Sequence, residues 1–380
     1  MTNGLEQNAS IFVLLKELQE VYLNGYSPIT PRISQHEYLD YLKSIPSATP
    51  FWRDRLDECR PCLLPTLSTR DSSNRRWSST VIDLPISREH LTASAARHNV
   101  DMKSMLQTAW ALVLRIYVGT DDVCFGYQTS GRDIPVNGVK EAVGCFSSTM
   151  VCRLQVPAAC SILSIIRTAE QSNQEALNHQ NAASSDIQYQ LGIRSQRMFN
   201  TCMSFGRMDI TTKLASNNGC RHIKSKLCSE YDLFIDINFS SESISLNIGQ
   251  RILDATQATA IAHAFGRAVQ TIIEAPECLV KQADLFSQYD HEQILAWNSM
   301  AKPDVCDQPI HELIAQQASA NPDRQAVCAW DGDFTYSELY RHSMALAGHL
   351  TVSGLEPQTL VPVIVDKSRW ALVAMVAVLL

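Results

Sequence analysis

Apolar side chains recur at every second position in two neighbouring stretches of this chain, 233–239 and 244–248. A period of two residues places successive side chains on opposite faces of a strand, so each stretch predicts a β-strand with one apolar face. The polar turn at 240–243 joins the two strands into a hairpin. This hairpin fixes part of a β-sheet in the second half of the chain.

Amphipathic helices alternate with the predicted strands. Residues 10–24 repeat apolar side chains at helical spacing, Ser87 and Asp101 are placed to cap two further helices, and Asp254-x-x-Gln257 is a capping box. We expect further strands at 79–84, 123–127, 150–156 and 199–205. The mixture predicts the α/β fold class.

A change of pattern divides the chain into three parts. Residues 283–309 contain Pro303 and Pro309 and show little periodicity, so they are interpreted as a linker between domains 1–282 and 310–380. The last part predicts a tight hairpin at 326–336, a helix from Thr335 to Gly354, and a strand at 360–365. The apolar run at 370–380 is expected to form a buried strand or helix.

Charge and composition exclude several classes of protein. The formal net charge is −7 and no basic stripe is present, which argues against a nucleic-acid partner. The N-terminus lacks the pattern of a signal peptide, and the run at 370–380 is shorter than the ~20 residues that span a bilayer. We therefore expect a cytoplasmic protein with no membrane partner.

The 12 cysteines are expected to be free thiols in a reducing compartment, because the chain shows no secretion signal. Cys59-Arg60-Pro61-Cys62 is the only CxxC sequence. A zinc site would need a second pair, and a redox motif would follow a strand rather than the helix predicted at 51–56. The spacing is therefore interpreted as coincidence, and no metal site is predicted.

Three sequence pieces in the first domain occur in an informative order. The first is Phe125-Gly126 with Ser130-Gly131-Arg132-Asp133; the second runs from Val143 to Arg153; the third is Asn178-His179-Gln180 with Phe199-Asn200 and Ser204-Phe205. In this order and spacing, over residues 1–290, they resemble the condensation domain of nonribosomal peptide synthetases. The resemblance implies a chloramphenicol-acetyltransferase-like condensation lobe.

This resemblance implies a reaction that joins two carrier-bound acyl groups through an amide bond. The family uses the motif HHxxxDG, whose second histidine serves the attacking amine, a task that suits an imidazole with a pKa near the working pH. Counted back from the helix at 9–18, the motif falls on Thr2, Asn3, Gln7 and Asn8 at its two histidine, aspartate and glycine positions. Both histidines and the aspartate are replaced, so no catalytic residue is expected.

The family pattern also pairs the motif aspartate with Arg132, and Gln7 cannot supply that charge. Arg132 is then expected to face solvent, to find another carboxylate, or to destabilise its region; a surface charge on a loop is the alternative. Asp133 is expected to serve the loop. His179 is expected to cap a helix rather than to catalyse.

A channel wall is predicted from the same pattern around Ser147, Ser148 and Thr149. Gly144, Asn200 and Ser204 are interpreted either as part of this substrate channel or as structural motif residues.

A second resemblance begins near residue 308. His311-Glu-Leu-Ile314, Asn321-Pro-Asp323 and Phe334-Thr-Tyr-Ser-Glu-Leu339, continued by 361–380, resemble the opening of an adenylation domain. The phosphate loop of that family lies beyond Leu380, so ATP, magnesium and phosphopantetheine are not expected to bind here.

These resemblances predict a fungal nonribosomal peptide synthetase fragment, a condensation–adenylation junction of secondary metabolism such as mycotoxin or siderophore synthesis, inactive as an isolated chain. One alternative is a docking module that binds a carrier domain or an upstream synthetase half, with Arg53, Arg55, Arg75 and Arg76 as candidate contacts. Another is a gene-model fragment that aggregates through residues 371–380.

Overall fold

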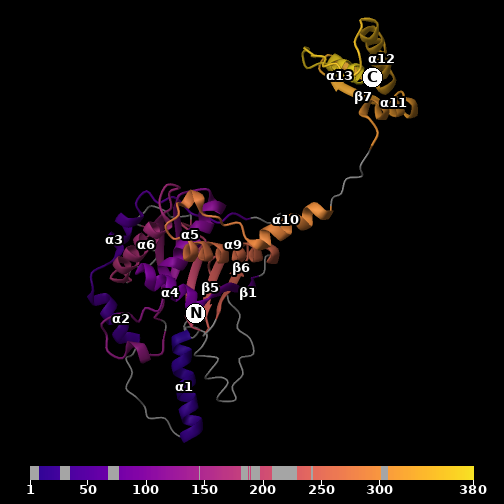
Figure 1. The fold of residues 1–380 in the computed structure, drawn as a ribbon. Coiled ribbons are helices and arrows are strands. Elements are labelled where there is room, and N and C mark those ends of the chain that lie inside the picture. Colours follow the sequence, from indigo (N-terminus) through magenta and orange to yellow (C-terminus); the bar gives the residue numbers. More distant parts are fainter. Residues whose placement is uncertain are drawn as a thin grey trace. The chain divides into compact units, whose positions relative to one another are not determined.

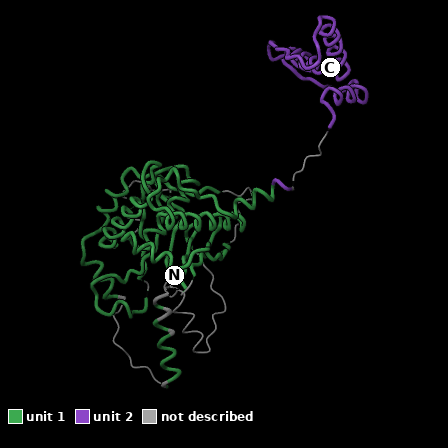
Figure 2. The backbone as a smooth tube through the Cα atoms, in the orientation of Figure 1, with its two compact units in different colours: residues 1–297 green, residues 298–380 purple. Residues whose placement is uncertain are grey.

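The chain divides into two compact units, residues 1–297 and 298–380, in a computed structural model (Figure 2). The structure describes residues 8–25, 35–66, 77–144, 146–180, 187, 189, 197–207, 229–240, 243–300 and 307–380. Each unit is considered by itself.

The first unit is built on a six-stranded sheet with the order β1-β6-β5-β4-β2-β3. Its strands are β1 (Ser78–Ser87), β2 (Asp122–Thr129), β3 (Ser148–Gln155), β4 (Thr201–Arg207), β5 (Leu233–Phe239) and β6 (Ser243–Gln250). Strand β4 runs parallel to both β2 and β5, and the other neighbours are antiparallel. The predicted β5–β6 hairpin is confirmed, and so is the α/β class.

Helices cover one face of this sheet (Figure 1). They are α4 (Arg88–His98), α5 (Met102–Val118), α6 (Ile162–Leu177) and α9 (Ala255–Glu274). Because side chains alternate between the two faces of a strand, Ile235 and Ile237 of β5 and Leu246 of β6 point toward the helices. They form the apolar core together with α5 and α9. The predicted caps are confirmed: Ser87 accepts from His90 N, Asp101 from Ser104 N, and Asp254 with Gln257 forms a capping box.

The chain that precedes β1 contacts both β3 and the end of α6, where Arg55 pairs with Glu175 over 3.0 Å. This part contains α1 (Asn8–Asn24), α2 (Gln35–Ser44) and α3 (Thr49–Leu56). After α3 the backbone pairs with the segment just before β4, because Cys62 N donates to Met198 O over 2.8 Å. Arg153 of β3 fastens the same segment by donating to the carbonyls of Arg55 and Asp57.

The segment interpreted as a linker, 283–309, includes a helix, α10 (Gln288–Met300), which begins where Ser287 binds Asp290. Its first turn also packs on the sheet unit, since Tyr289 stacks on His263 of α9 at 4.6 Å. The weak periodicity of this segment reflects a helix that exposes apolar side chains such as Leu295 and Trp297.

The second unit contains a small hairpin packed against helices. Its elements are α11 (Ile310–Ala320), β7 (Gln325–Ala329), β8 (Gly332–Thr335), α12 (Tyr336–Val352) and α13 (Arg369–Leu379). The core is Val327, Phe334, Leu339 and Val373. The predicted hairpin and the Thr335–Glu338 capping box are confirmed.

The strand predicted at 360–365 is wrong. These residues adopt no regular structure, and Leu360 and Ile364 are 96% and 92% exposed. An apolar segment becomes a strand only when a neighbouring strand shares its backbone hydrogen bonds. In the described part of this unit β7 and β8 pair with each other, and neither pairs with residues 360–365. The apolar run after it forms α13, one of the two alternatives expected.

Within the described ranges, no helix combines the length and the apolar character that crossing a bilayer requires.

Candidate functional site

Arg132 lies at the centre of a closed hydrogen-bond cluster. Its Nη1 donates to the carbonyls of Val139 at 2.6 Å, Ala142 at 2.7 Å and Lys140 at 3.2 Å. Its Nη2 donates to Ser10 Oγ of α1 at 2.9 Å. These residues, together with Gly144, are called the Arg132 cluster below.

Ser10 connects this cluster to the first helix. The fully buried hydroxyl accepts from Arg132 and from Gly144 N, and it donates to Gly144 O at 3.0 Å. The sequence spacing between Ser10 and Arg132 gives no signal of this contact. Ser10 is therefore a site residue that sequence reasoning missed.

The loop around Arg132 requires a glycine at position 131. Gly131 has φ +64°, and a Cβ placed there would lie 1.6 Å from Phe146 O. The Phe146 ring packs beneath the guanidinium at 4.6 Å and meets Tyr38 of α2 edge-on at 4.8 Å. The Gly131-Arg132 pair thus brings α1, α2 and the loop before β3 together.

The expectations for Arg132 need correction. The residue is 5% exposed, so it is neither a surface charge nor in contact with solvent, and no carboxylate in the described residues pairs with it. Backbone carbonyls and one hydroxyl satisfy the charge instead. Burial lowers the pKa of the guanidinium, and only the Nε atom is left without a hydrogen-bond partner.

A row of polar side chains crosses the face of the sheet opposite the α5–α9 core. Thr149 pairs with Gln128 across β3 and β2, Ser204 pairs with Asp236 across β4 and β5, and Asp236 pairs with Asn247 across β5 and β6. Gly126 is paired with Cys202, so alternation places Gln128 and Ser204 on the same face as well. Thr149, Gln128, Ser204, Asp236 and Asn247 are called the polar row below.

Asp236 is the charged group of the polar row. Its carboxylate accepts a short hydrogen bond from Ser204 Oγ and another from Asn238 Nδ2 at 3.1 Å. Burial raises the pKa of the Asp236 carboxyl, against the two hydrogen bonds that lower it. Asp236 was not singled out from the sequence, because it looked like one polar position in an alternating strand.

Aromatic rings cover the β2–β3 end of the same face. A Cβ at Gly126 would lie 2.8 Å from the Phe199 ring and 3.1 Å from Thr149, which explains the glycine of the Phe125-Gly126 motif. Phe199 stacks on Tyr231, and burial raises the pKa of the Tyr231 hydroxyl, which Thr149 contacts. Thr149 and Ser204 are therefore neighbours of one covered surface.

The remaining predicted residues divide between structural roles and exposed positions. Asn200 clamps residue 64 by bonding both its backbone N and O, at 2.8 and 3.0 Å, and it also contacts Asp232. Asp133 is exposed and accepts from Ser130 Oγ, as expected for a loop residue. Ser147 is exposed just before β3.

His179 serves packing. Its ring stacks on Phe51 at 3.9 Å and its carbonyl accepts from Trp52 Nε1 at 2.8 Å. Thr2, Asn3 and Gln7 lie outside the described residues, and Asn8 is the first residue of α1.

The CxxC cysteines meet a third thiol. Cys59 and Cys62 both contact Cys124 of β2, and a hydrogen bond from Cys124 together with the charge of Arg153 lowers the pKa of Cys59 against the effect of burial. Burial raises the pKa of Cys62. No group of three or more histidine, cysteine or acidic side chains among the described residues is arranged to hold a metal ion.

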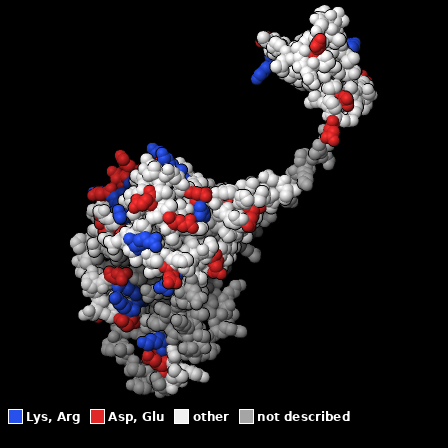
Figure 3. All heavy atoms as spheres, in the orientation of Figure 1, with Lys and Arg blue, Asp and Glu red and all other residues white. Residues whose placement is uncertain are grey.

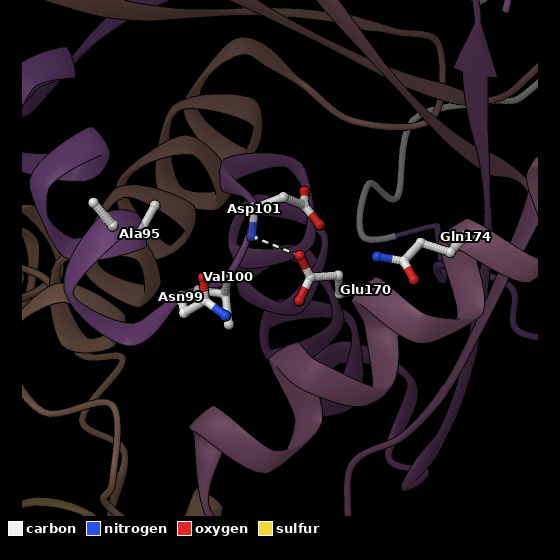
Figure 4. Close-up of a pocket in the computed structure, with 7 residues that line it drawn as sticks. Ala95, Asn99, Val100, Asp101, Glu170 and Gln174 are labelled. Atoms are coloured by element: carbon white, nitrogen blue, oxygen red, sulfur yellow. Dashed lines mark hydrogen bonds between the residues drawn. The ribbon is translucent and has the colours of Figure 1, made fainter.

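A pocket of about 350 Å³ lies where α4 ends and α5 begins (Figure 4). Its two carboxylates are already engaged: Glu170 accepts from Asp101 N at 3.1 Å, and Asp101 caps α5. The pocket is therefore explained by helix capping.

The basic side chains proposed as docking contacts are partly neutralised. Arg53 pairs with Asp54 at 2.7 Å and Arg55 with Glu175 at 3.0 Å, while Arg75 and Arg76 lie outside the described residues. Figure 3 shows acidic and basic side chains interspersed over the visible face of the first unit.

Family comparisons agree with this architecture. Residues 8–295 match the family model of the condensation domain, and residues 314–380 match that of the AMP-binding enzymes. Relatives that align with the whole chain include nonribosomal peptide synthetases of Emericella nidulans (atnA, 29% identical) and Aspergillus campestris (ungA′, 32% identical). The chain spans only 5% and 4% of their lengths.

Solved structures show the same fold. A four-domain nonribosomal peptide synthetase bound to AMP and glycine superposes with a TM-score of 0.69 at 14% identity, over 92% of this chain and 29% of that one. The X-domain from teicoplanin biosynthesis gives 0.59 at 18% identity, over 73% of this chain and 69% of that one. The chain belongs to the condensation-domain family of nonribosomal peptide synthetases and continues into an AMP-binding enzyme segment.

Proposed function

We propose that this chain is a condensation-family unit of a synthetase for a secondary-metabolite peptide, and that the chain alone forms no amide bond. One observation carries the second part: Arg132, which the family resemblance pairs with the motif aspartate, keeps its charge among three carbonyls and the Ser10 hydroxyl. That arrangement needs no carboxylate at position 7, where the chain has Gln7.

The chemistry of amide formation explains why the replaced motif matters. The acceptor amine attacks the carbonyl of the donor thioester, a thiolate leaves, and the nitrogen must lose a proton. A base with a pKa near neutrality accelerates this step by about 10²–10⁴-fold. Asn3 stands at the position of that base, and a carboxamide does not take up a proton near pH 7.

Missing sequence motifs also bear on the cofactors of the second unit. We propose that residues 310–380 bind neither ATP nor magnesium and carry no phosphopantetheine. The glycine-rich loop that cradles phosphate in such enzymes has no counterpart in this sequence range.

An amide-forming assay tests the proposal. The purified chain is mixed with two carrier domains loaded with aminoacyl groups, and the dipeptidyl carrier is measured by mass spectrometry, with an intact condensation domain as the positive control. We expect no more product than in the absence of protein. Product formed in proportion to the amount of chain would overturn the proposal.

A docking module is the second candidate, and the surface of α1 favours it. Leu14, Leu18, Val21 and Tyr22 are spaced along one face of the helix, and all four are exposed in the first unit, Leu18 by 56% and Tyr22 by 83%. An exposed apolar stripe suits a protein surface such as an upstream synthetase half better than an acidic carrier domain.

A binding assay separates this candidate from the first. The probe is the purified N-terminal half of a condensation domain from a relative, and the variant is Leu18→Glu with Tyr22→Glu. Lys16→Glu, on the same helix, is the control. Docking predicts capture by the parent and by Lys16→Glu, with loss in the double variant; equal capture of all three, or of none, removes the docking candidate.

A further inference from the structure

Three thiols meet where the chain that follows α3 reaches β2. Cys59 and Cys62 belong to the CxxC sequence and Cys124 belongs to β2, and the sulfur of Cys59 shares a hydrogen bond with the sulfur of Cys124. These residues are called the thiol cluster below. The proposed function uses none of the three.

Arg153 holds one side of the thiol cluster in place. It lies opposite Cys124 in the β2–β3 register, and side chains opposite each other on antiparallel strands share one face of the sheet. Its Nη1 donates to the carbonyls of Arg55 at 3.1 Å and Asp57 at 2.8 Å. Because Cys59 follows closely after Asp57, these anchored carbonyls keep it beside Cys124.

The other side of the cluster is fixed through Cys62. Its backbone N donates to Met198 O at 2.8 Å, and it forms a parallel bridge with Phe199. The sulfur of Cys62 meets the backbone of Cys124 rather than its thiol. The two sulfurs that share a hydrogen bond are therefore those of Cys59 and Cys124, which lie far apart in the sequence, and not the two of the CxxC sequence.

The members of the thiol cluster differ in exposure and in acidity. Cys59 is partly exposed, whereas Cys62 and Cys124 are buried. The hydrogen bond from Cys124 and the charge of Arg153 lower the pKa of Cys59 against the effect of burial. The same hydrogen bond and burial raise the pKa of Cys124 well above its ordinary value. Since the thiolate is the nucleophilic form of cysteine, an oxidant that arrives from solvent meets Cys59 first.

We propose that Cys59 is an oxidation site for hydroperoxides and that Cys124 resolves the oxidised product to an intrachain disulfide. In the first step the Cys59 thiolate attacks one peroxide oxygen. The S–O bond forms, the O–O bond breaks, and the leaving hydroxide takes up a proton to become water. The sulfur is thereby oxidised to a sulfenic acid, and the peroxide is reduced.

The second step joins the two sulfurs that already share a hydrogen bond. The Cys124 sulfur attacks the Cys59 sulfur, the S–S bond forms, and the sulfenic hydroxide leaves as water with the proton of Cys124. Rotation about the side-chain bonds brings such a pair to the ~2.05 Å of a disulfide. The new bond fastens the segment after α3 to β2, which constrains the unfolded chain and stabilises the first unit.

Peptide mapping of the full chain tests this inference, and it requires neither carrier domains nor amide formation. The reduced protein is treated with equimolar hydrogen peroxide, the remaining thiols are blocked with iodoacetamide, and the digest is analysed without reduction. We expect the peptides of Cys59 and Cys124 as the main linked pair, which dithiothreitol separates, and a higher melting temperature for the oxidised protein. A main link between Cys59 and Cys62, or a Cys59 that joins no other cysteine, would overturn the inference.

Two variants separate the roles of the thiols. Cys124→Ser removes the resolving thiol, so Cys59 should remain a sulfenic acid and its labelling by dimedone should rise severalfold over the parent. Cys62→Ser changes the other buried cysteine of the cluster and should leave the link between Cys59 and Cys124 unchanged. Loss of that link in a Cys62→Ser protein that thermal melting shows to be folded would contradict the inference. The map of the parent decides the outcome even where a buried substitution lowers stability.

Discussion

The first unit holds two largely buried charged groups that form no ion pair within the described residues, and the Arg132 cluster and the polar row accommodate them differently. Arg132 is surrounded by oxygen atoms that backbone geometry delivers, and four of its hydrogen bonds are made. Asp236 receives two hydrogen bonds and faces a further open acceptor. The guanidinium is thus largely satisfied by hydrogen bonds, whereas the carboxylate keeps unused hydrogen-bonding capacity.

Removing the guanidinium should have the largest effect on stability. Arg132→Met leaves the Ala142 carbonyl buried without its donor and the Val139 carbonyl with only the 3.4 Å bond from Ala142 N, and an unsatisfied buried group costs about 1–3 kcal/mol. We expect the free energy of unfolding of the first unit to fall by about 3 kcal/mol or more in urea titrations. Arg53→Met, at an exposed pair, should cost no more than about 1 kcal/mol. Equal losses would mean that Arg132 is not structural.

Ser10→Ala should cause the next largest loss of stability after Arg132→Met. The substitution removes the hydroxyl that bonds Arg132 and Gly144, and it leaves a buried N–H of Arg132 unpaired, at a cost of about 1–3 kcal/mol. Ser44→Ala, at an exposed serine of α2, should change the stability by about 0.5 kcal/mol or less. The same urea titrations compare the two, and similar values would remove Ser10 from the cluster.

Asp236→Asn should stabilise the fold, whereas the two substitutions above destabilise it. Because the pKa of Asp236 is raised in the folded state, its ionisation destabilises the fold as the pH rises through that value. The variant should melt at a higher temperature than the parent at pH 7. The difference should shrink below the ordinary aspartate pKa of about 3.9, where the parent is also neutral. A pH-independent difference would contradict this electrostatic description.

The thiols give the smallest effect, visible as reactivity rather than stability. Cys59 has a lowered pKa and is partly accessible, whereas Cys62 is buried and its pKa is raised. Iodoacetamide should therefore alkylate Cys59 before Cys62, and the reaction of Cys59 should begin at a lower pH than that of an ordinary thiol. Peptide mass spectrometry distinguishes the two positions; earlier labelling of Cys62 would contradict the assignment.

Local signals predicted much of this fold. Ser87, Asp101 and the Asp254–Gln257 box cap their helices because a cap depends on residues only three positions apart. The 233–248 hairpin was also predicted correctly, because its alternating strands and its turn lie within one short stretch of sequence. The strand at 360–365 failed because a strand also requires a distant partner, which its own residues do not specify.

The sites were less predictable, because they depend on distant contacts. Ser10 and Arg132 lie 122 positions apart, so no spacing rule connects them. The polar row exists only because β4 is placed between β2 and β5. Thr149 and Ser204 were singled out by family resemblance, but Asp236 and Asn247 became visible only with the strand register.

A double-mutant cycle between Ser10 and Arg132 tests most directly whether this arginine is a structural charge held by α1. Urea unfolding is measured for the parent, Ser10→Ala, Arg132→Met and the double variant. Contacting residues in one hydrogen-bond network are coupled by about 0.5–3 kcal/mol, and we predict a double variant less destabilised than the sum of the single ones by that amount. Strict additivity of the two losses would contradict the account.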